Sequence, residues 1–193
     1  ASTLYNNGFS VIRLHLRDHS PSSHLNTELF HAARLDEVLN ALQDIQERFN
    51  YGETYLAGFS LGGNFALRVR QEADNFALKL KHIVAISPVF SPHETMSALE
   101  NGTAIYRQYF IKKWKRALKI KAKHFPDIYD FNTLLASRNL SDMTDILIST
   151  QTPFASVQDY FDSYALNPNI IKQSNIKTDV LLAADDPVIP LNG

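Results

Sequence analysis

The stretch Leu-Ala-Gly-Phe-Ser-Leu-Gly-Gly-Asn at residues 56–64 constrains this chain more than any other. A β-prone run precedes it at 53–57, and an apolar segment with helical features follows at 64–72. Glycines two positions before and after Ser60 permit a tight, strained turn that exposes the serine hydroxyl. The pattern predicts a strand, a turn and a helix. Ser60 is then a candidate nucleophile, and the N–H of Leu61 a candidate oxyanion donor. The alternative is an inert serine on a glycine-rich turn.

The composition is that of an ordinary globular domain. The 193 residues are 45% hydrophobic and 20% charged, and the net charge is −1 at neutral pH. This balance gives no overall field that would recruit nucleic acid, so we expect no nucleic-acid partner. No apolar run reaches the length of a membrane span. The chain has no cysteine, which excludes disulfides and suits the reducing cytoplasm, where we expect the protein.

The order of the expected elements is typical of a parallel α/β sheet. Residues 1–8 lack the features of a signal peptide and read as the end of a helix that leads into a strand. A long amphipathic helix is expected at 28–49. Strands are expected at 9–16, 53–58, 81–87 and 178–183. Apolar strands that alternate with helices predict a mostly parallel sheet with helices on both of its faces.

Residues 89–175 interrupt this alternation with helical, aromatic-rich segments. Because they fall between two expected strands and after the Ser60 turn, they predict a helical cap insertion over the active-site face. We expect its aromatic side chains to line an apolar acyl pocket. These side chains are Phe90, Tyr106, Tyr109, Phe154, Tyr160 and Phe161.

Residues 106–123 are strongly basic and allow two interpretations. We favour a cap helix with a solvated basic face, because charge is balanced in the rest of the chain. The alternative is weak peripheral contact with an anionic membrane through the same helix. The helical spacing predicts an apolar stripe surrounded by lysines. The stripe would consist of Tyr106, Phe110, Trp114, Ala117 and Leu118.

A serine nucleophile needs a base, and the base needs a carboxylate that orients it. Residues 180–190 read as a strand that ends in an acidic turn. The turn would lie at the same sheet edge as Ser60, so Asp186 is the candidate acid and Asp185 is its alternative. The alternative is that the two aspartates have no catalytic role and only open a proline-containing turn.

No histidine follows Asp186, although the expected chain order is serine, acid, histidine. His19 lies in a loop after an expected strand, and His93 begins the cap. The N-terminal histidines lack the compact spacing of a zinc site, so we expect no metal. The seven histidines are His15, His19, His24, His31, His82, His93 and His124. The simplest expectation is a catalytic histidine beyond residue 193.

With these segments in place, the chain resembles the α/β-hydrolase superfamily, and within it the YheT-like subgroup. The matching motifs are Arg17-Asp18-His19, Gly58 to Asn64, Ile86-Ser-Pro88 and Ala184-Asp-Asp-Pro-Val188. The resemblance implies that Ser60 is the nucleophile, that Leu61 is an oxyanion donor and that Asp186 is the acid. It also implies a small-molecule acyl or lipid-like ester as substrate, with no cofactor.

The resemblance further implies that 1–193 is the central part of one α/β-hydrolase domain. The family's second oxyanion donor would lie before residue 1 and its histidine after residue 193. Its third strand would lie between 9–16 and 53–58, so we expect no direct hydrogen bonds between these two strands. The leading function is a serine esterase that forms an acyl-enzyme at Ser60. The alternatives are an acyltransferase and a non-catalytic binding protein, and this segment alone is expected to be inactive.

Overall fold

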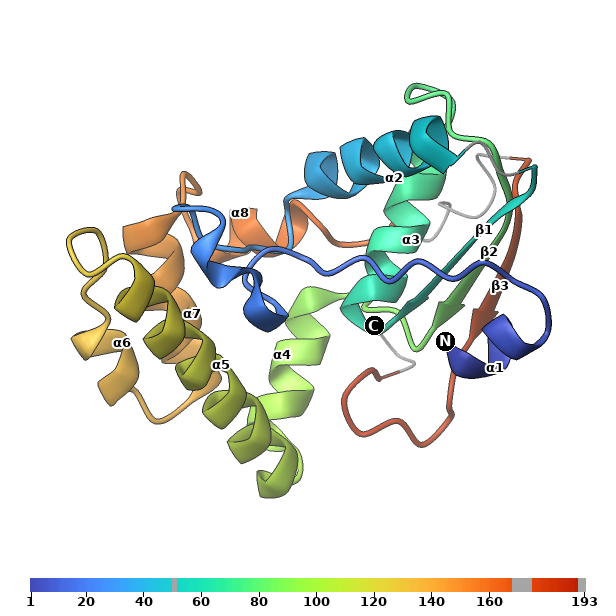
Figure 1. Ribbon diagram of the computed structural model, residues 1–193. Coiled ribbons are helices and arrows are strands. Elements are labelled where there is room, and N and C mark those ends of the chain that lie inside the picture. The colour runs from blue at the N-terminus through green and yellow to red at the C-terminus, as the bar shows by residue number, and fades with distance from the viewer. Residues whose placement is uncertain (50–51, 168–174, 191–193) are drawn as a thin grey trace.

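The computed structural model describes residues 1–49, 52–167 and 175–190. Within these ranges a small parallel sheet is flanked by helices, and a further group of helices comes between its second and third strands in the chain and lies to one side of the sheet (Figure 1). The elements are α1 (Ser2–Asn6), the 3-10 helix η1 (Ser20–His24), α2 (Leu35–Phe49), β1 (Thr54–Phe59), α3 (Leu61–Glu72), β2 (Leu80–Ile86), α4 (Pro92–Asn101), α5 (Ala104–His124), α6 (Asn132–Ala136), α7 (Leu140–Gln151), α8 (Val157–Asp162) and β3 (Lys177–Leu181).

The three strands are parallel and lie in the order β1-β2-β3. Phe59, Ile86 and Leu181 stand side by side at the carboxyl end of the sheet. Just beyond them, the N–H of Ser60 donates to the carbonyl of Ile86 (2.9 Å) and the N–H of Ser87 donates to the carbonyl of Leu181 (2.8 Å). The segments that follow the three strands therefore meet at the carboxyl end of the sheet, where ligand sites of α/β proteins lie.

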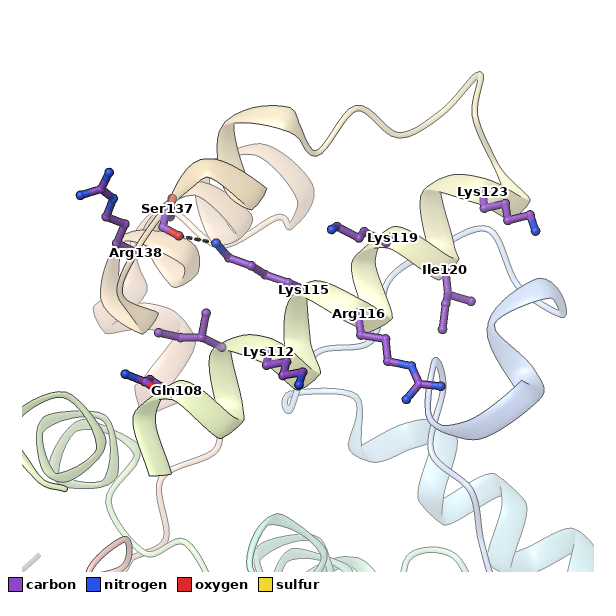
Figure 2. A pocket seen from close by; sticks show the side chains of 10 residues that line it. Gln108, Lys112, Lys115, Arg116, Lys119, Ile120, Lys123, Ser137 and Arg138 are labelled. Atoms are coloured by element: carbon purple, nitrogen blue, oxygen red, sulfur yellow. Dashed lines mark hydrogen bonds between the residues drawn. The ribbon is translucent and has the colours of Figure 1, made fainter. Parts of the chain in front are cut away.

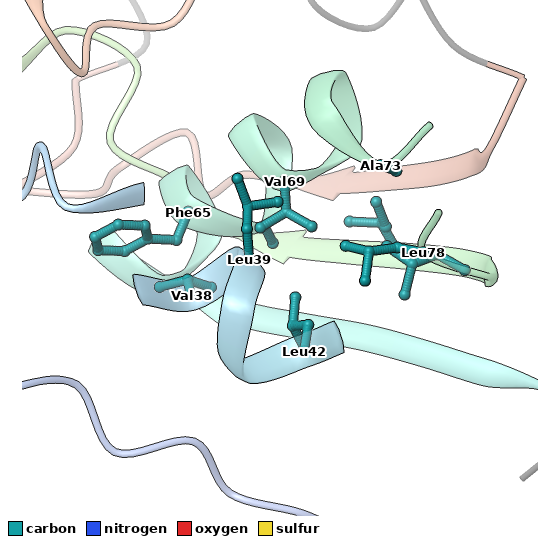
Figure 3. Packing of buried hydrophobic residues seen from close by; sticks show 10 residues of the cluster. Val38, Leu39, Leu42, Phe65, Val69, Ala73 and Leu78 are labelled. Carbon is teal, nitrogen blue, oxygen red and sulfur yellow. The ribbon is translucent and has the colours of Figure 1, made fainter. Parts of the chain in front are cut away.

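Helix α3 packs against β1 and β2, and α2 packs against α3 (Figure 3). This packing confirms the α/β class predicted from the sequence. On the opposite face of the sheet, Tyr55, Phe59 and Leu181 are exposed. The buried cluster consists of Val38, Leu39, Leu42, Phe65, Ala66, Val69, Ala73, Leu78, Leu80 and Ile83.

The strand predicted at 9–16 is not formed. This segment is extended, and the ring of Phe9 lies edge-on to Tyr55 of β1, with the ring centroids 5.8 Å apart. In the described part of the chain, β1 pairs with β2 alone, so 9–16 and β1 do not hydrogen-bond to each other, as expected. β-propensity reflects how well a residue fits a paired sheet, and without a hydrogen-bonded neighbour the segment has no ladder to join.

The predicted helix 28–49 begins only at Leu35. The backbone before it is held by side chains from elsewhere in the molecule. The N–H of Phe30 donates to Asp18 Oδ2 (2.8 Å), and the carbonyl of Ala32 accepts from Arg68 Nη1 (2.8 Å). A helix over 28–49 would pair the carbonyl of Ala32 internally, and here Arg68 bonds to it instead, so tertiary contacts outweigh helical periodicity.

The helices α4 to α8 form the insertion between β2 and β3, and they extend away from the sheet (Figure 1). Residues 168–174 of the predicted cap 89–175 lie outside the described residues. Helices α5, α6 and α7 bury a cluster of their own, to which Leu29 also contributes. Its other members are Leu118, Phe131, Leu134, Met143 and Leu147.

A buried lysine attaches this insertion to the rest of the chain. Lys121 of α5 is 1% exposed, and its Nζ lies 2.8 Å from Asp18 Oδ1. The same ammonium donates to the carbonyls of Asn26 (2.6 Å) and Glu28 (2.9 Å). The Lys121 ammonium thus pairs with a carboxylate and also bonds to backbone carbonyls of the 18–28 loop. It joins this loop to α5, about a hundred residues away in the chain.

Helix α5 is the longest helix in the described ranges, and its composition is strongly basic. Across those ranges, no helix combines the length and the apolar character that crossing a bilayer requires.

Candidate active site

Ser60 lies on a strained turn between β1 and α3. Its φ of 51° and ψ of −119° place a non-glycine residue in a sparsely populated backbone region. The turn is held by the bond to the carbonyl of Ile86, and Ser60 accepts from the N–H of Asn64 (3.0 Å). Ser60 itself is exposed. Such strain costs about 1–3 kcal/mol and concentrates at functional sites.

The N–H of Leu61 belongs to the first turn of α3. The first amides of a helix have no intrahelical acceptor, and the positive end of the helix dipole favours negative charge. Leu61 and Ser60 are adjacent, so an anion formed beside the serine hydroxyl would lie near this helix end.

The glycines around Ser60 differ in how much room each has for a side chain. A Cβ on Gly58 would lie 2.1 Å from the carbonyl oxygen of Gly62, which no real contact allows. A Cβ on Gly63 would lie 3.0 Å from Pro88, whereas one on Gly62 would meet nothing within 4 Å. Gly58 is therefore required by the close approach of the two backbones, whereas Gly62 has room for a side chain.

We expect Gly58→Ala and Gly62→Ala to change stability in opposite directions. Gly58→Ala forces the strand away from the first turn of α3 and should lower the free energy of unfolding by about 3 kcal/mol. Gly62→Ala places a better helix former in α3, and it should leave that free energy unchanged or raise it by up to about 1 kcal/mol. Urea unfolding of both variants measures the difference. Equal losses would contradict the steric distinction.

Asp186 is anchored in the turn that follows β3. Its Oδ1 accepts from the backbone amides of Val188 (2.9 Å) and Ile189 (3.0 Å), and Ser87 adds a side-chain hydrogen bond. Burial raises the pKa of the Asp186 carboxyl, but these three hydrogen bonds outweigh it and hold the pKa below its ordinary value of 3.8. Asp186 is therefore an anchored carboxylate at neutral pH, whereas Asp185 is exposed.

Ser87 was not among the residues predicted from the sequence. It follows β2, the strand between those of Ser60 and Asp186, and its φ of 40° gives a second strained turn at the same edge. The motif Ile86-Ser-Pro88 marked the end of this strand, but nothing in it indicated a bond to Asp186.

Asn64 and Arg68 were also missed as positioning residues. Asn64 is fully buried, and its Nδ2 donates to the carbonyls of Val89 (2.8 Å) and Tyr164 (2.7 Å). Arg68 bonds to the carbonyl of Ala32, and burial lowers the pKa of its guanidinium. Together they fasten the segments after β2, before α2 and after α8 onto α3, which carries Ser60 at its N-terminus.

The histidines lie in several separate places, and none of the described ones is hydrogen-bonded to Ser60. His19 Nδ1 lies 2.9 Å from the carbonyl of Arg17, and His82 Nε2 lies 2.9 Å from Asp179 Oδ2 on the sheet. The ring of His93 packs edge-on against Phe161, with the centroids 4.8 Å apart. Throughout the described ranges, no group of three or more His, Asp or Glu side chains is arranged to hold a metal ion.

An apolar cluster covers the base of the Ser60 turn. Helix α8 contributes Phe161, and Leu61 packs against this cluster from α3. Tyr160 of α8 accepts from the N–H of Ala32 (3.1 Å). The predicted acyl-pocket residues Tyr106 and Tyr109 are not part of the cluster, because α5 exposes both. The other buried members are Ala32, Val89, Tyr164 and Ile189.

His31 lies edge-on to Phe154 and Tyr160, at 5.7 and 6.4 Å between ring centroids. Burial, and then Arg34, lower the pKa of His31 from 6.5. Since the unfolded chain binds the proton more tightly, this contribution to stability is complete above pH 6.5 and is lost as the pH falls below it. When the pH falls from about 8 to about 5, the free energy of unfolding of His31→Phe should therefore decrease less than that of the natural protein. Urea unfolding at both pH values measures this, and parallel losses would contradict it.

Comparison with known proteins gives consistent matches. A family described as alpha/beta hydrolase fold matches residues 1–193. The chain is 22% identical over 184 residues to YheT of Escherichia coli (strain K12), which is designated an esterase; the match covers 93% of this chain and 53% of YheT. The chain thus spans about half the length of this relative.

Two solved structures are similar to this chain. A serine hydrolase, CCSP0084, from the hydrocarbon-degrading bacterium Cycloclasticus zankles aligns with a TM-score of 0.53 at 17% identity. The alignment covers 92% of this chain and 62% of that one, and it supports the fold alone. A carboxylesterase structure from the thaumarchaeon Nitrososphaera gargenis aligns at 16% identity over 97% of this chain and 66% of that one, with a TM-score of 0.43.

Proposed function

The chain belongs to the α/β-hydrolase fold family, and on this premise we propose that the protein is a serine hydrolase that cleaves a carboxylic ester. The backbone of Ser60 carries the proposal, because its strained φ of 51° between β1 and α3 has the geometry of a nucleophile elbow. The designation of YheT as an esterase supports the reaction class.

In the proposed reaction, the hydroxyl oxygen of Ser60 attacks the acyl carbon. The N–H of Leu61 donates to the resulting oxyanion, and the adjacent N-terminus of α3 stabilises its charge. A histidine takes the serine proton and delivers it to the leaving alcohol. Water, activated by the same histidine, then attacks the acyl-enzyme and releases the acid and Ser60.

Asp186 is proposed to orient that histidine. Its carboxylate is charged and anchored, and it follows β3 at the sheet edge that also holds Ser60. Since no histidine of the described ranges is bonded to Ser60 and YheT is about twice as long as this chain, we propose that the histidine belongs to a part of the protein outside these 193 residues.

Helices α4 to α8 are proposed to act as a cap. Phe161 of α8 packs in the same cluster as Leu61, so this end of the insertion lies at the Ser60 turn. The aromatic side chains around α8 give an apolar wall that suits the acyl part of an ester.

A fluorophosphonate probe on the full-length protein tests the proposal. We expect covalent labelling of one peptide, with the phosphonyl group on Ser60. Labelling should be lost in Ser60→Ala. Ser10→Ala is its matched control: it removes an exposed serine fifty residues before the turn and should label fully. Absence of labelling in the folded full-length protein would instead indicate a non-catalytic member of the family.

A further inference from the structure

Helix α5 concentrates the positive charge of the chain. Its 21 residues include eight lysines or arginines and no acidic residue. The whole chain, by contrast, has 19 basic and 20 acidic residues. The helix therefore carries a local positive surface that the net charge of −1 conceals.

The structure sorts the side chains of α5 onto two faces. Trp114 and Leu118 pack into the cluster with α6 and α7, and Lys121 is buried against Asp18. The outer face carries exposed residues spaced alternately four and three positions apart, which is the spacing of one helical stripe. We call this set the α5 stripe: Ile105, Tyr109, Lys112, Arg116, Lys119 and Lys123.

A groove of about 820 Å³ runs along the cationic part of the α5 stripe, from Lys112 to Lys123 (Figure 2). Lys112, Arg116 and Lys119 line it from α5, and Arg138 extends the positive charge from the connection between α6 and α7. Lys115 also lines the groove, but its ammonium donates to the carbonyls of Leu135 and Ser137, both at 2.6 Å.

The other groove cations have no such local role. Among the described residues, Lys112, Arg116 and Lys119 form no ion pair. Their charge is therefore available to an external anion.

The N-terminal end of the α5 stripe is apolar. Ile105 is 75% exposed and Tyr109 is 54% exposed, next to the first cation of the stripe. From Ile105 to Lys123 the stripe extends about 27 Å along one side of a straight helix. Clusters of lysine and arginine attract anionic phospholipid headgroups, and exposed aliphatic and aromatic side chains beside them can enter the boundary between headgroups and acyl chains.

We propose that the α5 stripe docks onto a bilayer that contains anionic phospholipids. The cations contact the headgroups, while Ile105 and Tyr109 enter the boundary between headgroups and acyl chains. This surface is on a different element from Ser60, so the inference does not depend on the proposed esterase reaction.

Two other occupants fit the stripe less well. Sequence-specific reading of base edges favours arginine forks, whereas the stripe has three lysines and one arginine, and its exposed Ile105 has no counterpart on a phosphate backbone. A second copy that docks stripe to stripe would bring like charges together, which is unfavourable.

Co-sedimentation of the full-length protein with vesicles tests the proposal. We expect binding to phosphatidylcholine vesicles that contain about one third phosphatidylglycerol, weakening as salt rises from about 0.1 M to about 1 M. Vesicles of phosphatidylcholine alone should bind little protein. Each cation removed should weaken binding roughly fivefold, so Lys112→Gln, Arg116→Gln and Lys119→Gln together should weaken it about 100-fold. Ile105→Ser should also weaken binding, because it removes the inserted aliphatic group.

The matched control makes the same charge change on other exposed cations, with Arg13→Gln, Lys79→Gln and Lys177→Gln. This variant should bind within about threefold of the natural protein. Circular dichroism verifies that each variant is folded. Absence of binding to anionic vesicles at about 0.1 M salt, or equal loss in both triple variants, would overturn the proposal. So would unchanged binding by Ile105→Ser, or binding to duplex DNA in place of vesicles.

Discussion

Ser60→Ala is expected to lower the esterase rate of the full-length protein by roughly 10³- to 10⁶-fold, with the KM for the ester changed little. The variant loses the oxygen that forms the acyl-enzyme, while the α3 amides and the apolar wall that bind substrate remain. Hydrolysis of p-nitrophenyl esters of increasing chain length measures both constants.

The size of this effect separates a nucleophile from a binding residue. If Ser60 only contacted the substrate, its replacement by alanine would raise KM and leave kcat nearly unchanged. Ser60→Cys keeps the shape of the turn and is the control for folding. A kcat of Ser60→Ala within tenfold of the natural protein would contradict the proposed acyl-enzyme.

Lys121→Met is expected to lower the free energy of unfolding by about 3–5 kcal/mol. The variant keeps most of the side-chain volume, but it leaves the Asp18 carboxylate, 11% exposed, without its counter-charge. It also leaves the carbonyls of Asn26 and Glu28 without their donor. Each kcal/mol corresponds to roughly 2–4 °C in Tm for a chain of this size, so thermal unfolding should show a large decrease.

A double-mutant cycle shows that the loss comes from this ion pair. Adding Asp18→Asn to Lys121→Met removes the uncompensated charge, so the double variant should lose less than the sum of the two single losses. The control Lys119→Ala, on the exposed face of the same helix, should change the free energy of unfolding by no more than about 0.5 kcal/mol. A loss below about 1 kcal/mol in Lys121→Met would show that the junction is not stabilising.

The sequence predicted the Ser60 turn and the three paired strands, and it missed features that depend on contacts with distant segments. The turn at Ser60 could be predicted because Gly58 and Gly62 approach each other within five residues of chain. The segment 9–16 has strand-forming residues, but a strand needs a hydrogen-bonded partner and the described ranges supply none.

Helical periodicity also misplaced part of α5. Apolar spacing assigned Tyr106 and Phe110 to the same stripe as Trp114, yet both are more than one third exposed. Lys121 is buried instead, because Asp18 supplies a counter-charge from a loop about a hundred residues away. No pattern within α5 indicates that partner, so the exposed basic face could be identified only after the helix had been packed. An exposed basic face is compatible with both interpretations of residues 106–123, and the vesicle experiment separates them.

The sequence by itself determined the strained turn at Ser60, the first amides of α3 and the acidic turn that contains Asp186. Each of these depends on backbone sterics and hydrogen bonds between residues a few positions apart. Only the tertiary structure decided that Ser87 bonds to Asp186, that Lys121 is buried and that the α5 stripe faces outward. These features depend on which distant segments pack together, and the spacing of residues along one chain segment does not contain that information.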